Sequence, residues 1–323
     1  MQIKLSSIIA FLAISVMYIC LSCLVMGALG EYFWLFDLFS HFRLQYIALL
    51  AGAGVTLLMI GRWRHGGLSL LVAMALAMPI LFKYYWQPST VQAIPQINSV
   101  SLLSFNVLTS NNNKQAVVDY ISDNKPDFAF AMETDSQWVA ALNVLEGQYP
   151  YSIYQPESNN FGLSFLSKHK IVHYRIERLE AGVATLIVYV EIHGTLLRII
   201  GTHPVPPVGK LNSKQRDSQL SKVADLINEE PSIPTIIAGD LNTSIWSHAF
   251  KKLKARAKLN EPTHGFGIQT TWKSNSILFA IPIDHILGNH LIRFLGKKVD
   301  ATLGSDHNPL RVEFSVVPEH VAF

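Results

Sequence analysis

The first third of the chain contains long runs of apolar residues without a single charge. The longest run covers Leu5–Leu29, and two shorter runs follow it before Lys83. A helix needs roughly 20 apolar residues to cross the hydrocarbon core of a bilayer, with a range of about 17 to 25. Tyrosine and tryptophan residues cluster near the ends of the runs, as they do at membrane–water interfaces. We therefore expect residues 1–87 to form a membrane anchor with three transmembrane helices, at about 5–29, 44–61 and 66–86.

A cleaved signal peptide is the alternative for the first run, with Lys4 as a short basic region. The apolar part of a signal peptide covers about 7 to 15 residues. This run is longer, so a retained helix is favoured. Both cysteines, Cys20 and Cys23, lie in the run, and the rest of the chain has none, which excludes thiolate metal sites there.

The charges of the short loops predict the orientation of the anchor. The loop Gly61–Gly66 carries two arginines, which is typical of a cytoplasmic loop, whereas the loop before it carries Glu31 and Asp37 against the single Arg43. The third helix would then leave the membrane on the outer side. The predicted location is the cell inner membrane, with a multi-pass anchor and the following domain on the extracytoplasmic (periplasmic) side.

After the anchor the composition becomes that of an ordinary soluble domain. Pro88 and Pro95 stand among polar residues and predict an extended linker at 88–97. The domain is expected over 98–318, with a short tail at 319–323. The formal net charge of the whole chain is only +3, and no basic stripe is present, so the charge does not favour tight nucleic-acid binding.

Apolar periodicity within this domain predicts an α/β (α+β) fold. Expected strands cover about 100–107, 128–132, 151–154, 163–166, 171–176, 184–192, 195–202, 283–287 and 310–316, with one more that ends in Asp240. Expected helices cover 114–124, 136–145, 214–228 and 248–257. Several strands follow one another without a helix between them, which argues against a simple parallel sheet. Two packed mixed β-sheets flanked by helices fit the pattern better.

Polar residues repeatedly end the apolar runs of the domain. The clearest case is Ile236–Asn242, in which an apolar run stops at Gly239-Asp240-Leu241-Asn242. The other residues of this kind are Asn106, Glu133, His203, Asp284, Asp306 and His307. Taken one at a time, each is better explained as an ordinary turn, loop or helix-capping residue. Together they supply carboxylate and amide oxygens with histidines, a set that suits Mg²⁺ or Mn²⁺.

The order of these motifs resembles the endonuclease/exonuclease/phosphatase (DNase I-like) superfamily of metal-dependent phosphoesterases. The resemblance covers roughly Asn98–Val317 and leaves the membrane segment outside. In chain order the motifs read Ser-Phe-Asn-Val, Pro-Asp-x5-Glu, Gly-Thr-His, Gly-Asp-Leu-Asn, Thr-Trp, Ile-Asp-His-Ile and Ser-Asp-His. Each motif is common by chance, but the ordered set is specific. The resemblance implies a four-layer sandwich, with two central sheets between helices.

The resemblance also implies roles for the matching residues. Glu133 would be the principal metal ligand, with Asn106 close to the metal and Asp306 at or near it. Asp240 would orient or deprotonate the attacking water. The remaining roles are a phosphate contact for Asn242 and His203, an essential histidine for His307, and a carboxylate that holds this histidine for Asp284.

Two further residues, Asn160 and Trp272, are expected to contact substrate. Asn160 is explained equally well as a plain turn residue. The chain departs from the family at Met132, where an amide is frequent, and at Pro204, which follows the Gly-Thr-His motif. Because a thioether replaces an amide at Met132, one hydrogen bond near the site is expected to be lost or replaced.

The sequence thus predicts a membrane-anchored phosphoesterase that depends on Mg²⁺ or Mn²⁺ and hydrolyses a phosphoester of a lipid head group or a nucleic acid. A water nucleophile, a Lewis-acidic cation and a positioned histidine are the groups that such hydrolysis needs. The alternative is a non-catalytic membrane sensor or scaffold that binds a phosphorylated ligand. A channel is disfavoured because the spans lack charges. The expected partners are a phosphoester substrate and, through the three helices, the membrane; no protein partner is predicted.

Overall fold

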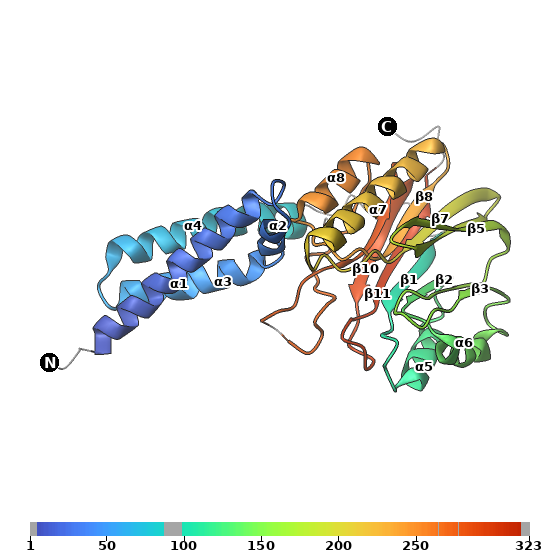
Figure 1. Ribbon diagram of the computed structural model, residues 1–323, viewed down its shortest axis with the longest axis horizontal. Coiled ribbons are helices and arrows are strands. Elements are labelled where there is room, and N and C mark those ends of the chain that lie inside the picture. Colours follow the sequence, from blue (N-terminus) through green and yellow to red (C-terminus); the bar gives the residue numbers. More distant parts are fainter. Residues whose placement is uncertain (1–4, 87–98, 264, 277, 318–323) are drawn as a thin grey trace.

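The computed structural model describes residues 5–86, 99–263, 265–276 and 278–317. The expected linker and tail lie outside these residues. The N-terminal part is a helical bundle, which projects from a two-sheet domain formed by residues 99–317 (Figure 1). The helices of the bundle are α1 (Leu5–Ala28), α2 (Trp34–Ser40), α3 (Arg43–Met59) and α4 (Trp63–Leu81), and the π-helix η1 (Phe82–Trp86) continues α4.

Two helical segments of the bundle, Leu5–Ala28 and Trp63–Trp86, are long and apolar enough to cross a membrane. The segment expected at 44–61 is α3, which is shorter and follows α2 at an angle of 62°. The pair α2–α3 passes the same test as one broken span, so the bundle has two such spans or three if the bent pair is counted. Helix α2 was not expected from the sequence.

The two-sheet domain contains a six-stranded and a five-stranded sheet. The strand order of the first is β10 (Ile292–Val299), β11 (Leu310–Val316), β1 (Val100–Asn106), β2 (Phe128–Met132), β4 (Leu163–Ser167) and β3 (Tyr151–Gln155). The order of the second is β5 (Ile171–Glu180), β6 (Val183–Ile192), β7 (Thr195–Thr202), β8 (Thr235–Asp240) and β9 (Asp284–Gly288). Each sheet has one parallel pair, β1–β2 and β7–β8, and all other neighbours are antiparallel. Both sheets are therefore mixed, as expected.

Helices cover the outer face of each sheet, which gives four layers. Phe128 and Phe130 on β2 point into the core between the sheets, whereas Ala129 and Ala131 point the other way, towards α5 (Lys114–Asn124) and α6 (Ser136–Leu142). A 3₁₀ turn, η3 (Asn143–Leu145), follows α6. Helices α7 (Lys210–Glu229) and α8 (His248–Arg256) cover the second sheet. Because both faces are buried, the strands read as continuous apolar runs rather than alternating ones.

The strands expected at 184–192 and 195–202 form a hairpin with His193-Gly194 as its turn, since β6 ends at Ile192 and β7 begins at Thr195. Both turn residues have positive φ, as a two-residue turn of the favoured type requires. The sequence did not reveal β10. Its pairing with β11 shifts register between Phe294 and Gly296, and this irregularity breaks the expected alternation.

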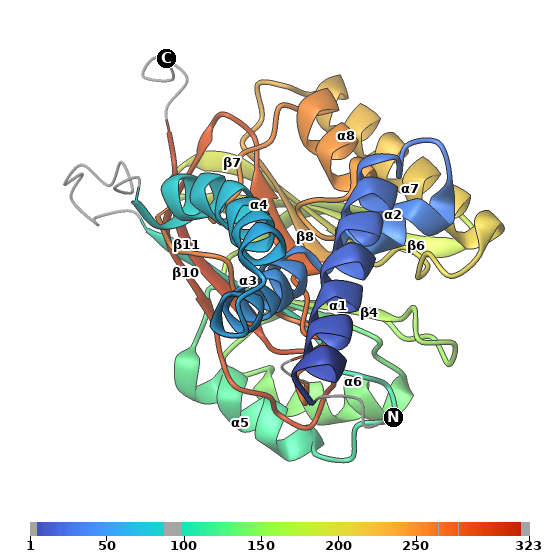
Figure 2. The same cartoon turned by 90° about the vertical axis from the view of Figure 1, so that its left-hand side faces the viewer.

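The helical bundle rests on the layer of α7 and α8. Leu44, Ile47, Ile80 and Tyr84 join the same apolar cluster as these two helices. Viewed from the bundle side, α2 lies beside α7 (Figure 2). The start of α1 and the turn between α3 and α4 lie at the end of the bundle that is far from the two-sheet domain (Figure 1).

Candidate active site

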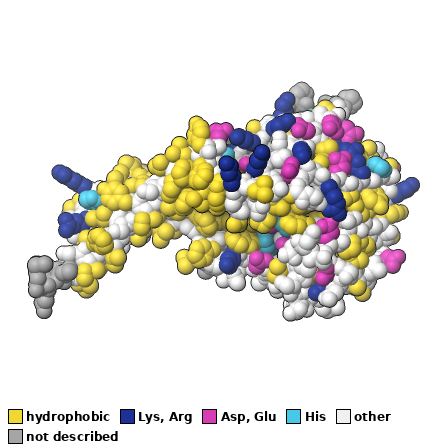
Figure 3. All heavy atoms as spheres, viewed as in Figure 1, with side chains coloured by type: hydrophobic (Ala, Val, Ile, Leu, Met, Phe, Trp, Pro, Cys, Tyr) yellow, Lys and Arg dark blue, Asp and Glu magenta, His cyan; other side chains and the backbone are white. Residues whose placement is uncertain are grey.

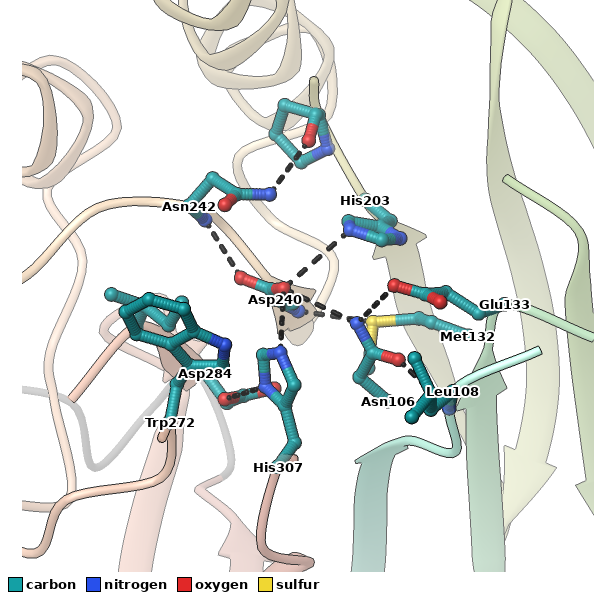
Figure 4. A network of polar contacts seen from close by, with 12 residues as sticks. Asn106, Leu108, Met132, Glu133, His203, Asp240, Asn242, Trp272, Asp284 and His307 are labelled. Atoms are coloured by element: carbon teal, nitrogen blue, oxygen red, sulfur yellow. Dashed lines mark hydrogen bonds and ion pairs between the residues drawn. The ribbon is translucent and has the colours of Figure 1, made fainter. Parts of the chain in front are cut away.

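Four strand ends, two from each sheet, place polar side chains at one point. Strand β1 ends in Asn106, and Glu133 follows β2 directly. In the other sheet His203 follows β7 and β8 ends in Asp240. Each pair of ends belongs to the parallel pair of its sheet, and carboxyl ends of parallel strands are where α/β sheets bind ligands. Figure 4 shows the four side chains facing one another.

Two antiparallel strands add the remaining members of the site. Strand β9 begins at Asp284, which lies opposite Asp240 in the pairing of β8 and β9. His307 comes shortly before β11, whose first residue Leu310 pairs with Ser104 near the end of β1. Because an antiparallel neighbour starts where its partner strand ends, both residues reach the same point. We call Asn106, Asp240, Asp284 and His307 the candidate catalytic cluster, or catalytic cluster for short.

His307 lies between two carboxylates in this cluster. Its Nδ1 is 2.8 Å from Asp284 Oδ2, and its Nε2 is 3.6 Å from Asp240 Oδ2. All three side chains are buried. The Ser305 hydroxyl accepts a hydrogen bond from the His307 backbone N–H and donates one to the Asn106 carbonyl, which holds the histidine against the end of β1.

The charges of the three groups move their pKa values apart. Burial opposes a charge on the imidazole, but Asp284 and Asp240 outweigh it and raise the pKa of His307 to about 10. Burial and the neighbouring Asp284 raise the pKa of Asp240 to about 7. Burial also acts to raise the pKa of Asp284, but the charge and hydrogen bond of His307 lower it below its usual value. The cluster thus places a histidine that favours its protonated form next to a carboxyl whose pKa is raised towards neutrality.

His203 approaches the same carboxylate from the other side. Its Nε2 lies 3.5 Å from Asp240 Oδ2, and its ring centroid lies 5.5 Å from that of Phe161. Burial and the charge of His307 lower the pKa of His203 to about 3, so the ring is neutral. Among the described residues its buried Nδ1 has no hydrogen-bond partner. Such an orphaned buried nitrogen is a typical contact point for a ligand.

Asn106 joins carboxylates from the two sheets. Its Nδ2 donates to Glu133 Oε1 at 2.8 Å and to Asp240 Oδ2 at 3.3 Å. The other Glu133 oxygen accepts a hydrogen bond from the Thr109 backbone N–H at 3.4 Å. Burial is the main cause that raises the pKa of Glu133.

The donor set of the site fits a hard divalent cation. Asp240, Asp284 and His307 each offer one ligand atom, and these atoms lie within 4.8 Å of one another, so the group can hold a metal ion. Glu133 and Asn106 extend the oxygen-rich side of the site. Carboxylate and amide oxygens are the ligands that Mg²⁺ and Mn²⁺ prefer.

The strand end at Asp240 depends on a glycine and a methionine. Gly239 has φ of 152°, and a Cβ at this position would come within 1.9 Å of the Thr202 carbonyl oxygen. The Asp240 backbone N–H donates to Met132 Sδ at 3.0 Å. Met132, which stands where the family frequently has an amide, thus supplies a weak sulfur acceptor to this backbone N–H.

The profile of the endonuclease/exonuclease/phosphatase family matches residues 103–307, which include every residue of the catalytic cluster. The chain belongs to this family. No curated protein matches the sequence.

Several solved structures share the fold of this endonuclease/exonuclease/phosphatase domain. A humanized D. rerio TDP2 is 19% identical, with a TM-score of 0.57, over 68% of this chain and 99% of that one. The human Nocturnin catalytic domain with bound sulfate is 19% identical, with a TM-score of 0.56, over 68% of this chain and 95% of that one. A beta toxin from Staphylococcus aureus is 18% identical, with a TM-score of 0.52, over 66% of this chain and 99% of that one. At such identities the likeness establishes the fold alone.

The site of this family member contains four non-glycine residues with positive φ. They are Leu108, Glu133, Asn160 and Asn242. Backbone strain of this kind clusters at functional sites, where the surrounding structure enforces it. At Asn242 the backbone N–H donates to Asp240 Oδ1 and the side chain donates to the Pro204 carbonyl, so both ends of the residue are fixed.

Three residues that were expected to bind metal or substrate lie outside the catalytic cluster: Asp306, Trp272 and Asn160. Asp306 Oδ2 accepts a hydrogen bond at 3.0 Å from Trp272 Nε1 and does not belong to the group that can hold a metal. The Trp272 ring centroid is 6.4 Å from that of His307, at the rim of the site. Asn160 is exposed in the turn before Phe161, which reaches His203, so it lies at the edge rather than in the centre.

Sequence reasoning missed a second buried polar group, next to the site. Arg216 donates to the Asn242 carbonyl at 2.6 Å and lies 3.4 Å from Asp37 on α2. Further contacts come from His41, Ser244 and Ser247, and we call these five residues the anchor cluster. No motif indicated it, because its members are far apart in the sequence. Arg216 is fully buried, as is Gln219 one turn further along α7.

Proposed function

We propose that this protein is a membrane-anchored, divalent-metal-dependent phosphoesterase that uses water to cleave a phosphodiester. The observation that carries this proposal is the position of His307 between Asp284 and Asp240, at the meeting point of four strand ends. Two neighbouring groups with pKa values pushed apart are the usual arrangement for paired acid and base chemistry.

The proposed reaction assigns one proton to each group. Asp240, with a pKa raised to about 7, accepts a proton from the attacking water as the water oxygen bonds to phosphorus. His307, with a pKa raised to about 10, is protonated and donates to the phosphoryl group or to the departing alkoxide. Asp284 holds the imidazole by its Nδ1 and thereby points Nε2 at the reacting atoms. The products are a phosphomonoester and an alcohol.

The remaining residues bind and orient the substrate in this proposal. The orphaned Nδ1 of His203 is one candidate contact for a phosphoryl oxygen. The side chain of Asn242, whose Nδ2 also donates to the Pro204 carbonyl, is the other. Glu133 and Asn106 would hold the Mg²⁺ or Mn²⁺, with Asp306 nearby. The bound cation would supply Lewis acidity and neutralise charge on the phosphoryl oxygens. Because both ring nitrogens of His307 already face carboxylates, we favour the Glu133 side for the cation.

We also propose a location for the reaction. The helices α1, α2–α3 and α4 would anchor the chain in the cell inner membrane, and the arginine-containing turn between α3 and α4 favours the cytoplasm for that end. The two-sheet domain lies at the opposite end of the bundle and would therefore face the periplasm. A cysteine introduced in the exposed α5 at Asp119 should then react with a membrane-impermeant maleimide in intact cells; protection until lysis would contradict this orientation.

The activity is tested with the full chain purified in detergent. We expect Mg²⁺-dependent hydrolysis of a chromogenic phosphodiester that stops with EDTA and falls by roughly 10² to 10⁴ in His307→Ala. His290→Ala is the matched control because His290 is exposed, and its activity should equal that of the wild type. A folded protein that cleaves no phosphodiester but binds a phosphorylated ligand would instead support the alternative of a sensor or scaffold.

A further inference from the structure

A large apolar cavity lies between the membrane anchor and the candidate active site. Its volume is about 1120 Å³. One wall is the domain-proximal part of α3, including Leu44, Ala48 and Leu49, and the other is formed by residues of 270–276 and 278–280. Ligand sites of small molecules usually measure about 300–1,000 Å³ and are mostly apolar. The cavity is therefore large enough for a sizeable apolar group.

The cavity and the active site share a wall. Trp272 lines the cavity, and its indole N–H donates a hydrogen bond to Asp306. The backbone of Trp272 also forms an antiparallel β-bridge with His307. Asn308, the residue after His307, lines the cavity as well. A molecule whose phosphate lies at His307 would thus meet the cavity on passing Trp272. Figure 4 shows Trp272 next to the pair Asp284–His307.

The outer wall carries exposed apolar side chains. Leu278 is 72% exposed and Phe279 is 55% exposed, and both line the cavity on the side facing α3. Gln45 on α3 ties this loop to the bundle by donating to the Ala280 carbonyl at 2.8 Å. Figure 3 shows that hydrophobic side chains cover the bundle and continue onto the adjoining part of the two-sheet domain. This surface is continuous with helices that are apolar enough to lie in a bilayer.

We propose that the cavity binds the hydrocarbon chain of the substrate, so that the substrate is a membrane lipid with a phosphodiester head group. This inference rests on the proposed phosphodiesterase activity. Lys273, which lines the cavity with its Nζ 5.9 Å from the Trp272 ring centroid, supplies a positive charge on the wall that the cavity shares with the candidate active site. The cavity thus suits the apolar chain of the lipid, and the adjacent lysine suits its anionic head group.

The test uses the full chain in detergent and two soluble chromogenic diesters, ethyl and dodecyl p-nitrophenyl phosphate, below their micellar concentrations. In both, water adds to phosphorus, the bond to the aryl oxygen breaks, and p-nitrophenolate leaves. Each buried methylene favours binding by up to about fourfold. We expect kcat/KM for the dodecyl ester to exceed that for the ethyl ester by at least about tenfold, the gain from a few buried methylenes. Equal kcat/KM for the two esters would overturn the inference.

Filling the cavity provides the matched comparison. Ala48→Trp should abolish the preference for the dodecyl ester and leave turnover of the ethyl ester unchanged, because Ala48 lines the cavity but lies outside the catalytic cluster. Val55→Trp is the control, since Val55 is exposed on the same helix and does not line the cavity. If Ala48→Trp does not fold, Phe279→Ser on the exposed loop replaces it. A preference that survives in the folded variant would contradict the proposal.

A binding measurement separates this inference from the activity. Dodecyl phosphate with a photoreactive diazirine at the chain end should cross-link to residues 44–49 and 272–280, and less so in Ala48→Trp. Cross-links spread evenly over the exposed faces of α1 and α4 would indicate nonspecific detergent-like binding and would overturn the inference. Specific cross-links without hydrolysis of either ester would support the chain-binding site and contradict the proposed phosphodiesterase.

Discussion

The catalytic cluster and the anchor cluster are both buried and polar, but they differ in how their hydrogen-bonding groups are used. In the anchor cluster Asp37 accepts from the Ser247 hydroxyl at 2.6 Å and from the His248 backbone N–H at 3.0 Å, so each carboxylate oxygen has a partner. In the catalytic cluster Asp284 Oδ1 has no hydrogen-bond partner within the described ranges, and neither has His203 Nδ1 next to it. Buried polar groups are normally satisfied, so exceptions point to ligand binding.

The two clusters also differ in electrostatics. In the catalytic cluster two carboxylates share one imidazole, and Asp240 is held near the point of half-ionisation. In the anchor cluster the charge of Asp37 faces the guanidinium of Arg216, which also contacts the carboxylate of Asp217 and the carbonyl of Asn242. The first arrangement favours proton transfer, and the second favours a fixed geometry. The satisfied cluster thus supports the loop after β8, on which the unsatisfied one depends.

The largest effect is expected from Asp284→Asn, which breaks the catalytic cluster. An amide in place of the carboxylate can donate to His307 Nδ1 and reverse the tautomer, so we expect kcat to fall by about 10² to 10⁴. The loss of one of two carboxylates should also lower the pKa of His307, which now stands at about 10. A pH titration of the imidazole by NMR measures this. An unchanged pKa with lost activity would show that Asp284 does not act through His307.

A smaller effect, on stability rather than chemistry, is expected from Asp37→Ala. The change removes the carboxylate on α2 that faces the buried Arg216. It also leaves two donors, the Ser247 hydroxyl and the His248 backbone N–H, without their acceptor. Together these losses should lower the free energy of unfolding by about 3 kcal/mol. Thermal unfolding of the full chain in detergent checks this. Glu31→Ala is the control, because the Glu31–Lys252 pair joins the same two regions at the exposed surface and should leave the melting temperature unchanged. Equal effects of both changes would show that the buried anchor cluster stabilises the protein no more than an exposed ion pair does.

The smallest effect is a pH-dependent gain in stability from Asp240→Asn in the metal-free protein. The pKa of Asp240 is raised from 3.8 to about 7, so the folded state holds this proton more tightly than the unfolded state does. Its contribution to stability is therefore fully present below about pH 4 and is lost as the pH rises to about 7.

Asparagine at position 240 does not ionise, so the variant should equal the wild type in melting temperature near pH 4 and exceed it by a few degrees at pH 8. Asp119→Asn, at an exposed helical position, serves as the control and should shift nothing. A variant that is less stable than the wild type at pH 8 would contradict the raised pKa.

Family, fold class and most elements were predictable because each depends on local pattern. Apolar runs that stop at Asn106, Glu133, His203 and Asp240 locate the strand ends from the order of residues alone, and the four layers follow from helices on both outer faces. The predicted roles in metal and substrate binding remain predictions. Short or irregular elements were missed: α2 is a single short aromatic helix, and β10 carries a bulge.

The sequence by itself determined which side chains end the strands, because the period of an apolar run and the residue that stops it are properties of neighbouring residues. The tertiary structure decided which of these side chains meet: it brought Asp284 against His307 and left Asp306 on Trp272. It also decided that Asp37 of the anchor contacts Arg216, and that α3 and the loop after Thr270 enclose a cavity. Such contacts join residues far apart in the chain, and only the packing of complete elements brings them together.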